Sequence, residues 1–181
     1  MKIFAETPRL ILREMTLADA KGMLALNSDP DVMRYIGTPV VTTIEDNIKG
    51  IEFVRQQYDE LGVGRLSVIL KETNEFIGWS GLKRVTETLN GQSNYLDLGY
   101  RFIQKYWGKG YATEAARASL AYGFSTFDDA KIYAIIMPDN SSSRNVLEKS
   151  GLRYVNNFIG YDEDLAWYEI SREEWENSKK R

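Results

Sequence analysis

Residues 98–115 read Leu98-Gly99-Tyr100-Arg101-Phe102-Ile103-Gln104-Lys105-Tyr106-Trp107-Gly108-Lys109-Gly110-Tyr111-Ala112-Thr113-Glu114-Ala115. A strand-like segment passes through a Gly-x-Gly turn directly into an Ala-rich helical segment. Such a turn brings backbone N–H groups together at a helix N-terminus, where free donors and the helix dipole favour an anion. The two glycines carry no Cβ atom that would block a phosphate. Because residues 98–113 contain three basic residues and no Asp or Glu, the stretch predicts a phosphate-binding loop.

The loop differs from two common phosphate motifs. A P-loop needs G-x-x-x-x-G-K-[ST], but Tyr111 follows Gly110. The dinucleotide fingerprint needs a third glycine, and Thr113 stands at that position. A short Gly-x-Gly also fits an ordinary strand-to-helix turn with solvated lysines, so the rest of the chain has to decide between the two interpretations.

The segments around this loop predict an α+β fold. Polar and apolar residues follow a strand-like pattern over Leu66–Leu70, Phe76–Val85 and Tyr95–Ile103, and Asn90-Gly91 is a strong hairpin signal, so an antiparallel meander is expected. Helices are expected over Thr16–Leu26, Val32–Tyr35, Thr43–Leu61, Thr113–Phe127, Ser141–Lys149 and from Ser171 onward, and further strands over Arg9–Arg13, Ile132–Met137, Tyr154–Tyr161 and Leu165–Ile170. No repeat or linker interrupts the pattern, which predicts a single domain over residues 1–181 with a mixed sheet.

The composition excludes several kinds of chemistry. The chain has 181 residues, no cysteine and no histidine, so it offers no thiol nucleophile, no Ser-His-Asp triad and none of the usual Cys/His zinc sites. We expect no metal. The net charge of −3 argues against nucleic acid and anionic membranes as partners. No run approaches the ~18 apolar residues of a membrane span, and the first residues contain no apolar export segment. We expect a cytoplasmic protein.

Six motifs together carry a resemblance to a known family. They are Thr7-Pro8-Arg9-Leu10-Ile11-Leu12-Arg13, Ile77-Gly78, Leu98-Gly99-Tyr100, the loop from Trp107 to Ala115, Asn140-Ser141-Ser142-Ser143 and Leu147-Glu148-Lys149-Ser150-Gly151-Leu152. In this order they resemble the GNAT N-acetyltransferases, specifically the RimJ/RimL-like branch that acetylates ribosomal protein N-termini. The resemblance implies a fold of αβα layers, with a mixed, mostly antiparallel twisted sheet flanked by helices. It also implies acetyl-CoA as the acetyl donor, and it allows a homodimer.

The resemblance implies where coenzyme A binds. The loop residues Gly108, Lys109, Gly110, Tyr111, Ala112 and Thr113 would hold its pyrophosphate. The strand that ends at Phe102-Ile103 would splay from the strand Ile132–Met137, so that pantetheine adds there like an extra strand. Asn140 would contact pantetheine, and the hydroxyl of Ser143 would lie near the sulfur. Asn140 also fits a plain helix N-cap.

The catalytic residues follow less directly. Leu147 stands where many relatives have the tyrosine that reprotonates the thiolate, so Ser143, another tyrosine or water must donate that proton. An amine acceptor is protonated near neutrality and needs a base. With no histidine, the base is a carboxylate or water: Asp97, or the cluster Asp162, Glu163 and Asp164, although each also fits a solvated surface carboxylate. A backbone N–H near Phe102 or Ile103 would meet the oxyanion.

These residues predict direct transfer of acetyl to a primary amine. A protein N-terminal α-amine is the favoured acceptor, and a small amine such as a polyamine, an amino acid or an antibiotic is the alternative. A non-catalytic acyl-CoA sensing domain is the rival from another class, because Leu147 and the unassigned base leave the chemistry incomplete. An open groove or a closed pocket leading to the sulfur would separate the two kinds of acceptor.

Overall fold

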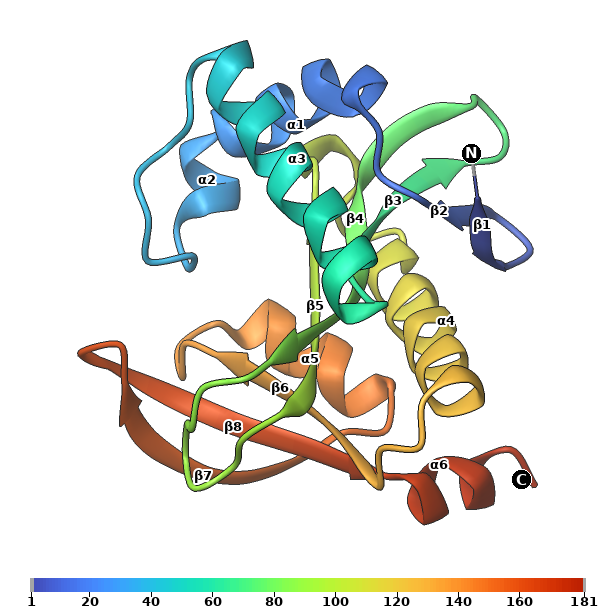
Figure 1. Ribbon diagram of the computed structural model, residues 1–181, viewed down its shortest axis with the longest axis vertical. Helices are drawn as coiled ribbons and strands as arrows, with labels where there is room; N and C mark the ends of the chain where they lie inside the picture. The colour runs from blue at the N-terminus through green and yellow to red at the C-terminus, as the bar shows by residue number, and fades with distance from the viewer. Residues whose placement is uncertain (1, 181) are drawn as a thin grey trace.

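A mixed eight-stranded sheet is the centre of the computed structural model, which describes residues 2–180 (Figure 1). The strand order is β1-β2-β3-β4-β5-β6-β8-β7. The bounds are β1 Ile3–Glu6, β2 Leu10–Arg13, β3 Arg65–Leu70, β4 Glu75–Val85, β5 Tyr95–Phe102, β6 Lys131–Ile136, β7 Arg153–Gly160 and β8 Glu163–Ser171. All neighbouring strands pair antiparallel except β5 and β6, which are parallel. The predicted mixed, mostly antiparallel sheet is confirmed.

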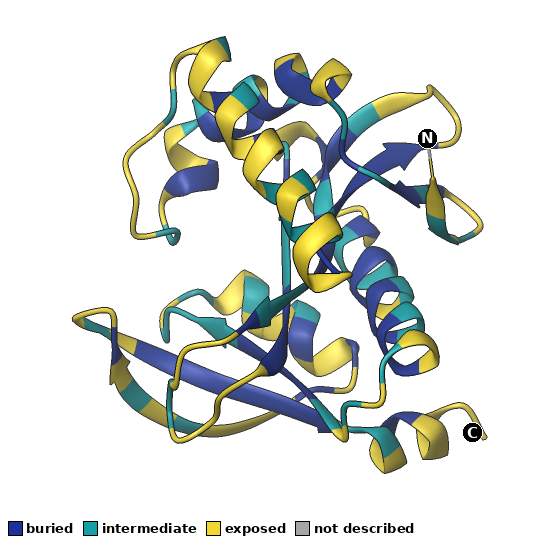
Figure 2. Cartoon of the chain, in the orientation of Figure 1, coloured by how far each residue is buried: buried dark blue, intermediate teal, exposed yellow. Residues whose placement is uncertain are grey.

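Helices cover both faces of this sheet. Their bounds are η1 Leu17–Asp19, α1 Ala20–Asn27, α2 Pro30–Met33, α3 Ile44–Leu61, η2 Gln104–Tyr106, α4 Tyr111–Thr126, α5 Ser141–Lys149 and α6 Arg172–Ser178. Apolar residues of α4 pack with Leu82 and Leu96 of β4 and β5, whereas α1 and α3 pack with Phe76 and Trp79 of β4. Because side chains alternate along a strand, these two groups of helices lie on opposite faces. Figure 2 shows the buried residues concentrated in the strands and on the inner sides of the helices.

The parallel pair β5–β6 is short and opens into a notch. Its register consists of Leu96 opposite Ile132 and Asp97 opposite Tyr133, after which the two strands run apart (Figure 1). The amide of Ile103 bonds to Ile77 in β4, so alternation along β5 directs the backbone groups of Tyr100 and Phe102 away from β4. Backbone donors and acceptors in the middle of the sheet therefore face the notch.

Two turns of the sheet contain consecutive residues with positive φ. Asn90 and Gly91 both have positive φ, 48° and 74°, as a two-residue hairpin turn of this kind requires. The β7–β8 turn uses the same conformation at Tyr161 and Asp162, with φ values of 54° and 61°, although neither is glycine. The four-residue strand β1 was not predicted from the sequence. Among residues 2–180 no helix is both long enough and apolar enough to span a membrane.

Candidate active site

The Gly-x-Gly loop enters α4 in the predicted way. Gly108 and Gly110 have φ values of 73° and 81°, a region that side chains with a Cβ rarely adopt. The first helical hydrogen bond runs from the amide of Glu114 to the carbonyl of Gly110. The amides of Tyr111, Ala112 and Thr113 precede that bond, so as first-turn donors they have no partner within the helix. The loop is exposed and can present these amides to a phosphate.

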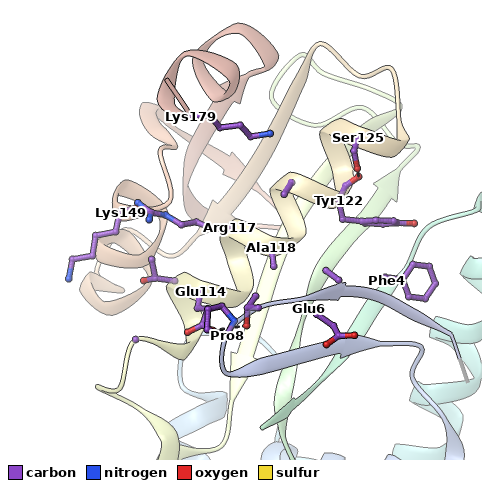
Figure 3. A pocket seen from close by; sticks show the side chains of 15 residues that line it. Phe4, Glu6, Pro8, Glu114, Arg117, Ala118, Tyr122, Ser125, Lys149 and Lys179 are labelled. Atoms are coloured by element: carbon purple, nitrogen blue, oxygen red, sulfur yellow. Dashed lines mark hydrogen bonds between the residues drawn. The ribbon is translucent and has the colours of Figure 1, made fainter. Parts of the chain in front are cut away.

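The acidic residue in the first turn of α4 is held away from this loop. The Glu114 carboxylate accepts hydrogen bonds from Thr7 Oγ1 at 2.6 Å, from Arg9 Nε at 2.7 Å and from the Arg9 amide at 3.1 Å. Burial alone would raise the pKa of Glu114, but the hydrogen bonds from Thr7 and Arg9 outweigh it and lower that pKa. Figure 3 shows Glu114 beside Pro8, in a shallow depression between β1 and the outer side of α4. Its charge is therefore neutralised before a phosphate arrives.

A cavity of about 620 Å³ connects the loop with the notch between β5 and β6. The predicted cofactor residues that line it are Phe102, Gly108, Gly110, Tyr111, Ala112, Thr113, Asn140 and Ser143. Its other walls come from Asp31 and Val32 of α2, the following residues 34–36, and Tyr100 and Arg101 of β5. Segments more than 100 positions apart in the sequence thus meet in one site.

Asn140 and Ser143 lie at the N-terminus of α5, facing this cavity. The side-chain oxygen of Asn140 accepts a hydrogen bond from the Ser143 amide at 3.1 Å, so Asn140 caps the helix. Its amide nitrogen makes no hydrogen bond to residues 2–180 and remains available to a ligand. The hydroxyl of Ser143 is likewise without a partner among those residues. The helix cap and the predicted ligand contact are therefore compatible at Asn140.

Tyr100 fixes the position of Ser143 from across the notch. Its hydroxyl donates to the Ser143 carbonyl at 3.0 Å and joins β5 to α5. Burial raises the pKa of Tyr100, and the bond to Ser143 only partly offsets this shift. Tyr100 therefore stays protonated at neutral pH. The sequence analysis did not single out Tyr100 as a site residue.

Leu147 lies in the hydrophobic core rather than in the cavity. It is 1% exposed and packs with Leu98, Ala134 and other apolar residues beneath α5. Where the family resemblance would place a tyrosine hydroxyl, this chain has an apolar side chain that stabilises the core. Of the predicted proton donors, the Ser143 hydroxyl lines the cavity.

The geometry does not support Asp97 as the base. Asp97 is 6% exposed, does not line the cavity and pairs with Arg65, with Nη2 and Oδ2 2.5 Å apart. Gly99 belongs to the same contact, because a Cβ atom there would lie 2.6 Å from Arg65 Nη2. The glycine thus makes room for an arginine side chain. Asp97 and Arg65 are 32 positions apart, so sequence spacing could not reveal the pair.

Ile103 and Lys109 are the two predicted cofactor residues that lie outside the cavity lining. The Ile103 amide donates to the Ile77 carbonyl at 3.0 Å, so it cannot stabilise an oxyanion without breaking the sheet. Among the two predicted donors, this leaves the Phe102 amide, which faces the notch. The Lys109 side chain lies over the Tyr106 ring at 5.6 Å, and its carbonyl accepts from Arg9 Nη1 at 2.9 Å. Neither Ile103 nor Lys109 lines the cavity.

The cavity contains one carboxylate among the described residues that line it, at its end beside α2. Asp31 in α2 accepts a hydrogen bond from Gln104 Nε2 at 3.1 Å. The predicted cluster at residues 162–164 lies at the β7–β8 turn and does not line the cavity. Glu163 approaches the segment after α2, since a Cβ atom on Gly37 would lie 3.3 Å from its Oε1. Sequence periodicity gave no signal for Asp31, because it lies in a four-residue helix.

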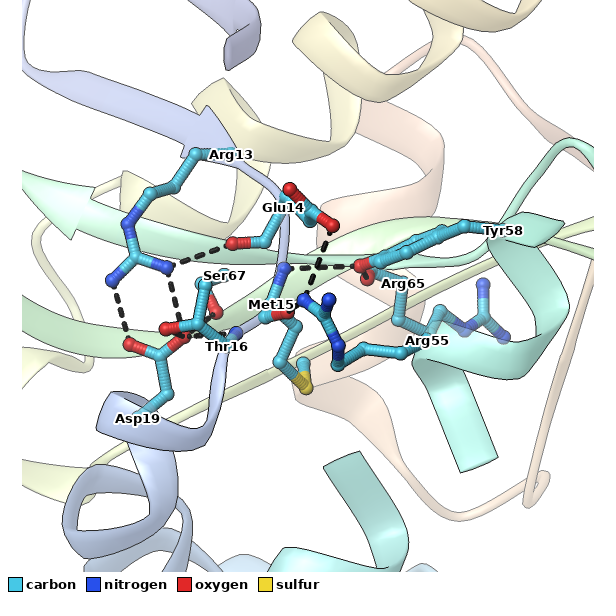
Figure 4. Close-up of polar contacts among 9 residues, drawn as sticks. All are labelled: Arg13, Glu14, Met15, Thr16, Asp19, Arg55, Tyr58, Arg65 and Ser67. Carbon is cyan, nitrogen blue, oxygen red and sulfur yellow. Dashed lines mark hydrogen bonds and ion pairs between the residues drawn. The ribbon is translucent and has the colours of Figure 1, made fainter. Parts of the chain in front are cut away.

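A buried polar cluster supports the helices on the acceptor side (Figure 4). Asp19 pairs with Arg13 at 2.6 Å and also accepts hydrogen bonds from Ser67 Oγ and the Thr16 amide. Tyr58 of α3 accepts a hydrogen bond from the Met15 amide at 3.1 Å, and burial raises its pKa to about 12. These bonds join β2, β3 and α3 to the start of α1, which packs against α2.

Comparisons with known proteins agree with this geometry. The family model described as Acetyltransferase (GNAT) domain matches residues 9–153. "Uncharacterized protein YkkB" of Bacillus subtilis (strain 168) is 36% identical over 167 residues, 90% of this chain and 92% of that protein. "Uncharacterized N-acetyltransferase p20" of Bacillus licheniformis is 33% identical over 151 residues, 81% of this chain and 83% of that protein. The crystal structure of a GNAT-family acetyltransferase from Bacillus anthracis has a TM-score of 0.76 and 32% identity, and the match covers 96% of this chain and 99% of that one. These names specify no acceptor.

Proposed function

Since the chain belongs to the GNAT acetyltransferase family, we propose that it transfers acetyl from acetyl-CoA directly to a primary amine. The observation that carries the proposal is a single cavity that joins three features. It contains the glycine loop at the start of α4, the backbone notch beside Tyr100 and Phe102, and the unpartnered Ser143 hydroxyl. Together they offer donors for a pyrophosphate, for an extended amide chain and for a leaving thiolate.

The loop and the notch position the donor. First-turn amides of α4 and the positive helix end bind the pyrophosphate, and Glu114 does not repel it because Arg9 neutralises that charge. Backbone groups of Tyr100 pair with the amides of pantetheine, whereas the Phe102 carbonyl already accepts a hydrogen bond from Trp107 Nε1 at 2.7 Å. The Asn140 side-chain amide donates to the same arm. The thioester carbonyl then lies near the Phe102 amide, which stabilises negative charge on its oxygen.

The proton transfers belong to two side chains of this cavity. Asp31, directly or through a water molecule, takes the proton from the acceptor ammonium, so that the neutral nitrogen attacks the thioester carbon. The C–N bond forms and the C–S bond breaks; the Ser143 hydroxyl gives its proton to the thiolate and takes up the second proton of the attacking nitrogen, directly or through water, so the serine is restored and the amide product is neutral. The chain offers no cysteine for an acyl-enzyme. Attack by the amine in a ternary complex is therefore the simplest sequence of steps.

Two acceptor classes fit this mechanism. A protein N-terminal α-amine follows from the resemblance to the RimJ/RimL-like branch. A small amine is the alternative, and Glu163 lies against Gly37, next to the cavity-lining residues 34–36, where its carboxylate would attract a cationic amine. An acceptor screen with N-terminal peptides, polyamines, amino acids and aminoglycosides, scored by thiol release from acetyl-CoA, distinguishes them.

Mass spectrometry tests the direct mechanism. We expect no acetylated enzyme after incubation with acetyl-CoA alone, and an N-acetylated product only when the amine is added. A stable acetyl-enzyme would overturn direct transfer. Tight acetyl-CoA binding without turnover on any amine would overturn the enzymatic proposal in favour of a sensing domain.

A further inference from the structure

Two arginines of the sheet share one aromatic ring, and only one of them has an acidic partner. The guanidinium carbons of Arg65 and Arg101 lie 5.4 and 5.2 Å from the centre of the Trp79 ring. Arg65 pairs with Asp97. No carboxylate of residues 2–180 pairs with Arg101. Arg101 lines the cavity on its acceptor side, next to α2.

The contacts of Arg101 leave most of its donors unused. Its Nη1 donates to Asn27 Oδ1 at 2.7 Å and lies 3.3 Å from Met33 Sδ, and both partners are neutral. Its Nε is enclosed and has no hydrogen-bond partner. Nη2 makes no hydrogen bond to the described residues and is not enclosed in this way, so it remains reachable from the cavity. A guanidinium has five N–H donors, and the chain supplies acceptors at only one nitrogen.

A relay of amides holds Arg101 in this place. Asn27 donates to Asn47 Oδ1 at 2.8 Å, and Asn47 donates to the Thr43 carbonyl at 2.8 Å. Both asparagines are buried, at 8% and 2% exposure. The relay orients the Asn27 oxygen toward Arg101, so α1 and α3 position the guanidinium without neutralising it.

A cation held in this way is costly without an anion. Burial, with a smaller contribution from the nearby Arg65, lowers the pKa of Arg101 to about 10. A buried charge is normally paired, and a guanidinium binds a carboxylate through parallel charge-assisted hydrogen bonds. The pyrophosphate of coenzyme A is already assigned to the loop at α4. The missing anion therefore belongs to the acceptor.

We propose that Arg101 binds a carboxylate of the acceptor, and that the acceptor is a primary amine of the amino-acid class. This inference rests on the proposed function and narrows its acceptor. The carboxylate has two chemical sources: the α-carboxylate of a free amino acid, or the side chain of an acidic first residue in a peptide. In both, the amine and the carboxylate belong to one residue, so they fit one cavity together.

The test compares acids with their amides on two enzymes. Initial rates are measured for α-amino acids and their primary carboxamides, and for peptides that begin with Asp or Glu and their Asn or Gln counterparts. Each is assayed with the wild type and Arg101→Gln. For each acceptor, we take the ratio of the wild-type rate to the Arg101→Gln rate. This ratio removes the effect of the different amine pKa values of acids and amides. Arg34→Gln is the matched control, because Arg34 lines the same cavity from the segment after α2.

We expect Arg101→Gln to lower kcat/KM for the acids by about tenfold or more, mainly through KM, and to change the amides by less than about threefold. A loss of kcat/KM on free amino acids identifies the α-carboxylate as the source of the bound group, and a loss on acidic peptides identifies the side chain of the first residue. Arg34→Gln should leave the ratio of acid to amide unchanged. An equal loss on acids and amides, or no loss on either, would overturn the proposal.

Two further measurements keep the inference separate from folding and from turnover. Thermal unfolding of the free protein should show Arg101→Gln at least as stable as the wild type, whereas a purely structural arginine would lower the melting temperature. In the presence of coenzyme A, millimolar acidic amino acids should raise the melting temperature of the wild type but not that of Arg101→Gln. A raised melting temperature without any acetyl transfer would support the binding site and refute the enzymatic proposal. No protection of the wild type by any acid would refute the binding site.

Discussion

Arg9 and Glu114 are 105 positions apart, and their side chains meet with Nη2 and Oε2 at 2.6 Å. Arg9 Nη1 also donates to the Lys109 carbonyl at 2.9 Å, and its guanidinium lies 4.5 Å from the centre of the Tyr111 ring. One side chain from the β1–β2 turn thus contacts the glycine loop and the first turn of α4. The shape of the loop depends on the N-terminal strands as well as on its own glycines.

Arg9→Lys should weaken coenzyme A binding about three- to tenfold while the charge is retained. A lysine has one ammonium group and cannot reach Glu114 and the Lys109 carbonyl with separate donors. Calorimetric titration with coenzyme A measures the effect. Arg55→Lys is the control, because Arg55 pairs with Glu14 at a similar exposure and far from the loop. Equal affinities for Arg9→Lys and the wild type would show that Arg9 does not shape the loop.

Gly108→Val should weaken coenzyme A binding at least tenfold, about 1.4 kcal/mol or more. The matched control is Gly91→Val, because the two glycines have φ values of 73° and 74° and neither would meet a neighbour with a Cβ atom. Both variants therefore suffer similar backbone strain, about 1–2 kcal/mol of stability. Only the valine at position 108 lies where we propose that the pyrophosphate binds. Equal affinities for the two variants would contradict the assignment of the phosphate site.

Ser143→Ala should lower kcat about tenfold or more without changing coenzyme A affinity, because the variant loses the proton donor for the thiolate. Tyr100→Phe should have a smaller effect of the same kind, since it only releases the Ser143 carbonyl. Ser141→Ala, in the same helical turn but outside the cavity lining, is the control. Single-turnover rates measure the chemical step. An unchanged rate in Ser143→Ala would assign the proton to water.

Asp31→Asn and Asp97→Asn should separate catalysis from stability. Asp31→Asn should lower kcat/KM at neutral pH and have less effect as rising pH deprotonates the amine itself. Asp97→Asn should instead destabilise the fold by about 3 kcal/mol, because Arg65 loses the charge of its buried partner. Rate profiles against pH and urea unfolding measure the two effects. A pH-dependent loss of rate in Asp97→Asn, with no such loss in Asp31→Asn, would restore Asp97 as the base.

Asp19→Asn should destabilise the protein by about 3 kcal/mol at pH 7, since it leaves Arg13 buried without its counter-ion. Burial opposes ionisation of Asp19, but the hydrogen bonds from Arg13, Thr16 and Ser67 lower its net pKa below 3.8. A lowered pKa stabilises the fold above about pH 4, and the gain is lost as pH falls through the folded value. The stability difference between wild type and variant should therefore be constant above pH 4 and shrink below it. A difference that grows in acid would show that the pKa of Asp19 is raised.

The sequence predicted local structure better than the partners of its charged residues. The meander and the Asn90-Gly91 turn follow from side-chain alternation and from residues that tolerate positive φ. The turn at Tyr161-Asp162 breaks that rule and could not be read from composition. The strand β1 is only four residues long, too short for a reliable period.

The backbone conformation at the candidate site could be predicted from the sequence. The glycine loop and Asn140 lie in motifs whose local conformation follows from their own residues. The side-chain roles were harder, because Asp97 is engaged by Arg65 and Arg101 is held by Asn27, partners 32 and 74 positions away. Spacing along the chain contains no information on such contacts. The exposed Asp31 and the buried Asp97 look alike in sequence, and only packing distinguishes them.

The notch between β5 and β6, where we propose that pantetheine binds, links ligand binding to the stability of the fold. Among residues 2–180, β5 and β6 have no paired positions beyond Asp97 and Tyr133, and the hydroxyl of Tyr100 bonds β5 to α5. A pantetheine arm bound there would supply hydrogen bonds between the two halves of the sheet. Binding to the native state alone shifts the unfolding equilibrium by mass action. On this proposal, saturating acetyl-CoA should raise the melting temperature of the protein, and the amide hydrogens of Tyr100 and Phe102 should exchange more slowly when it is bound.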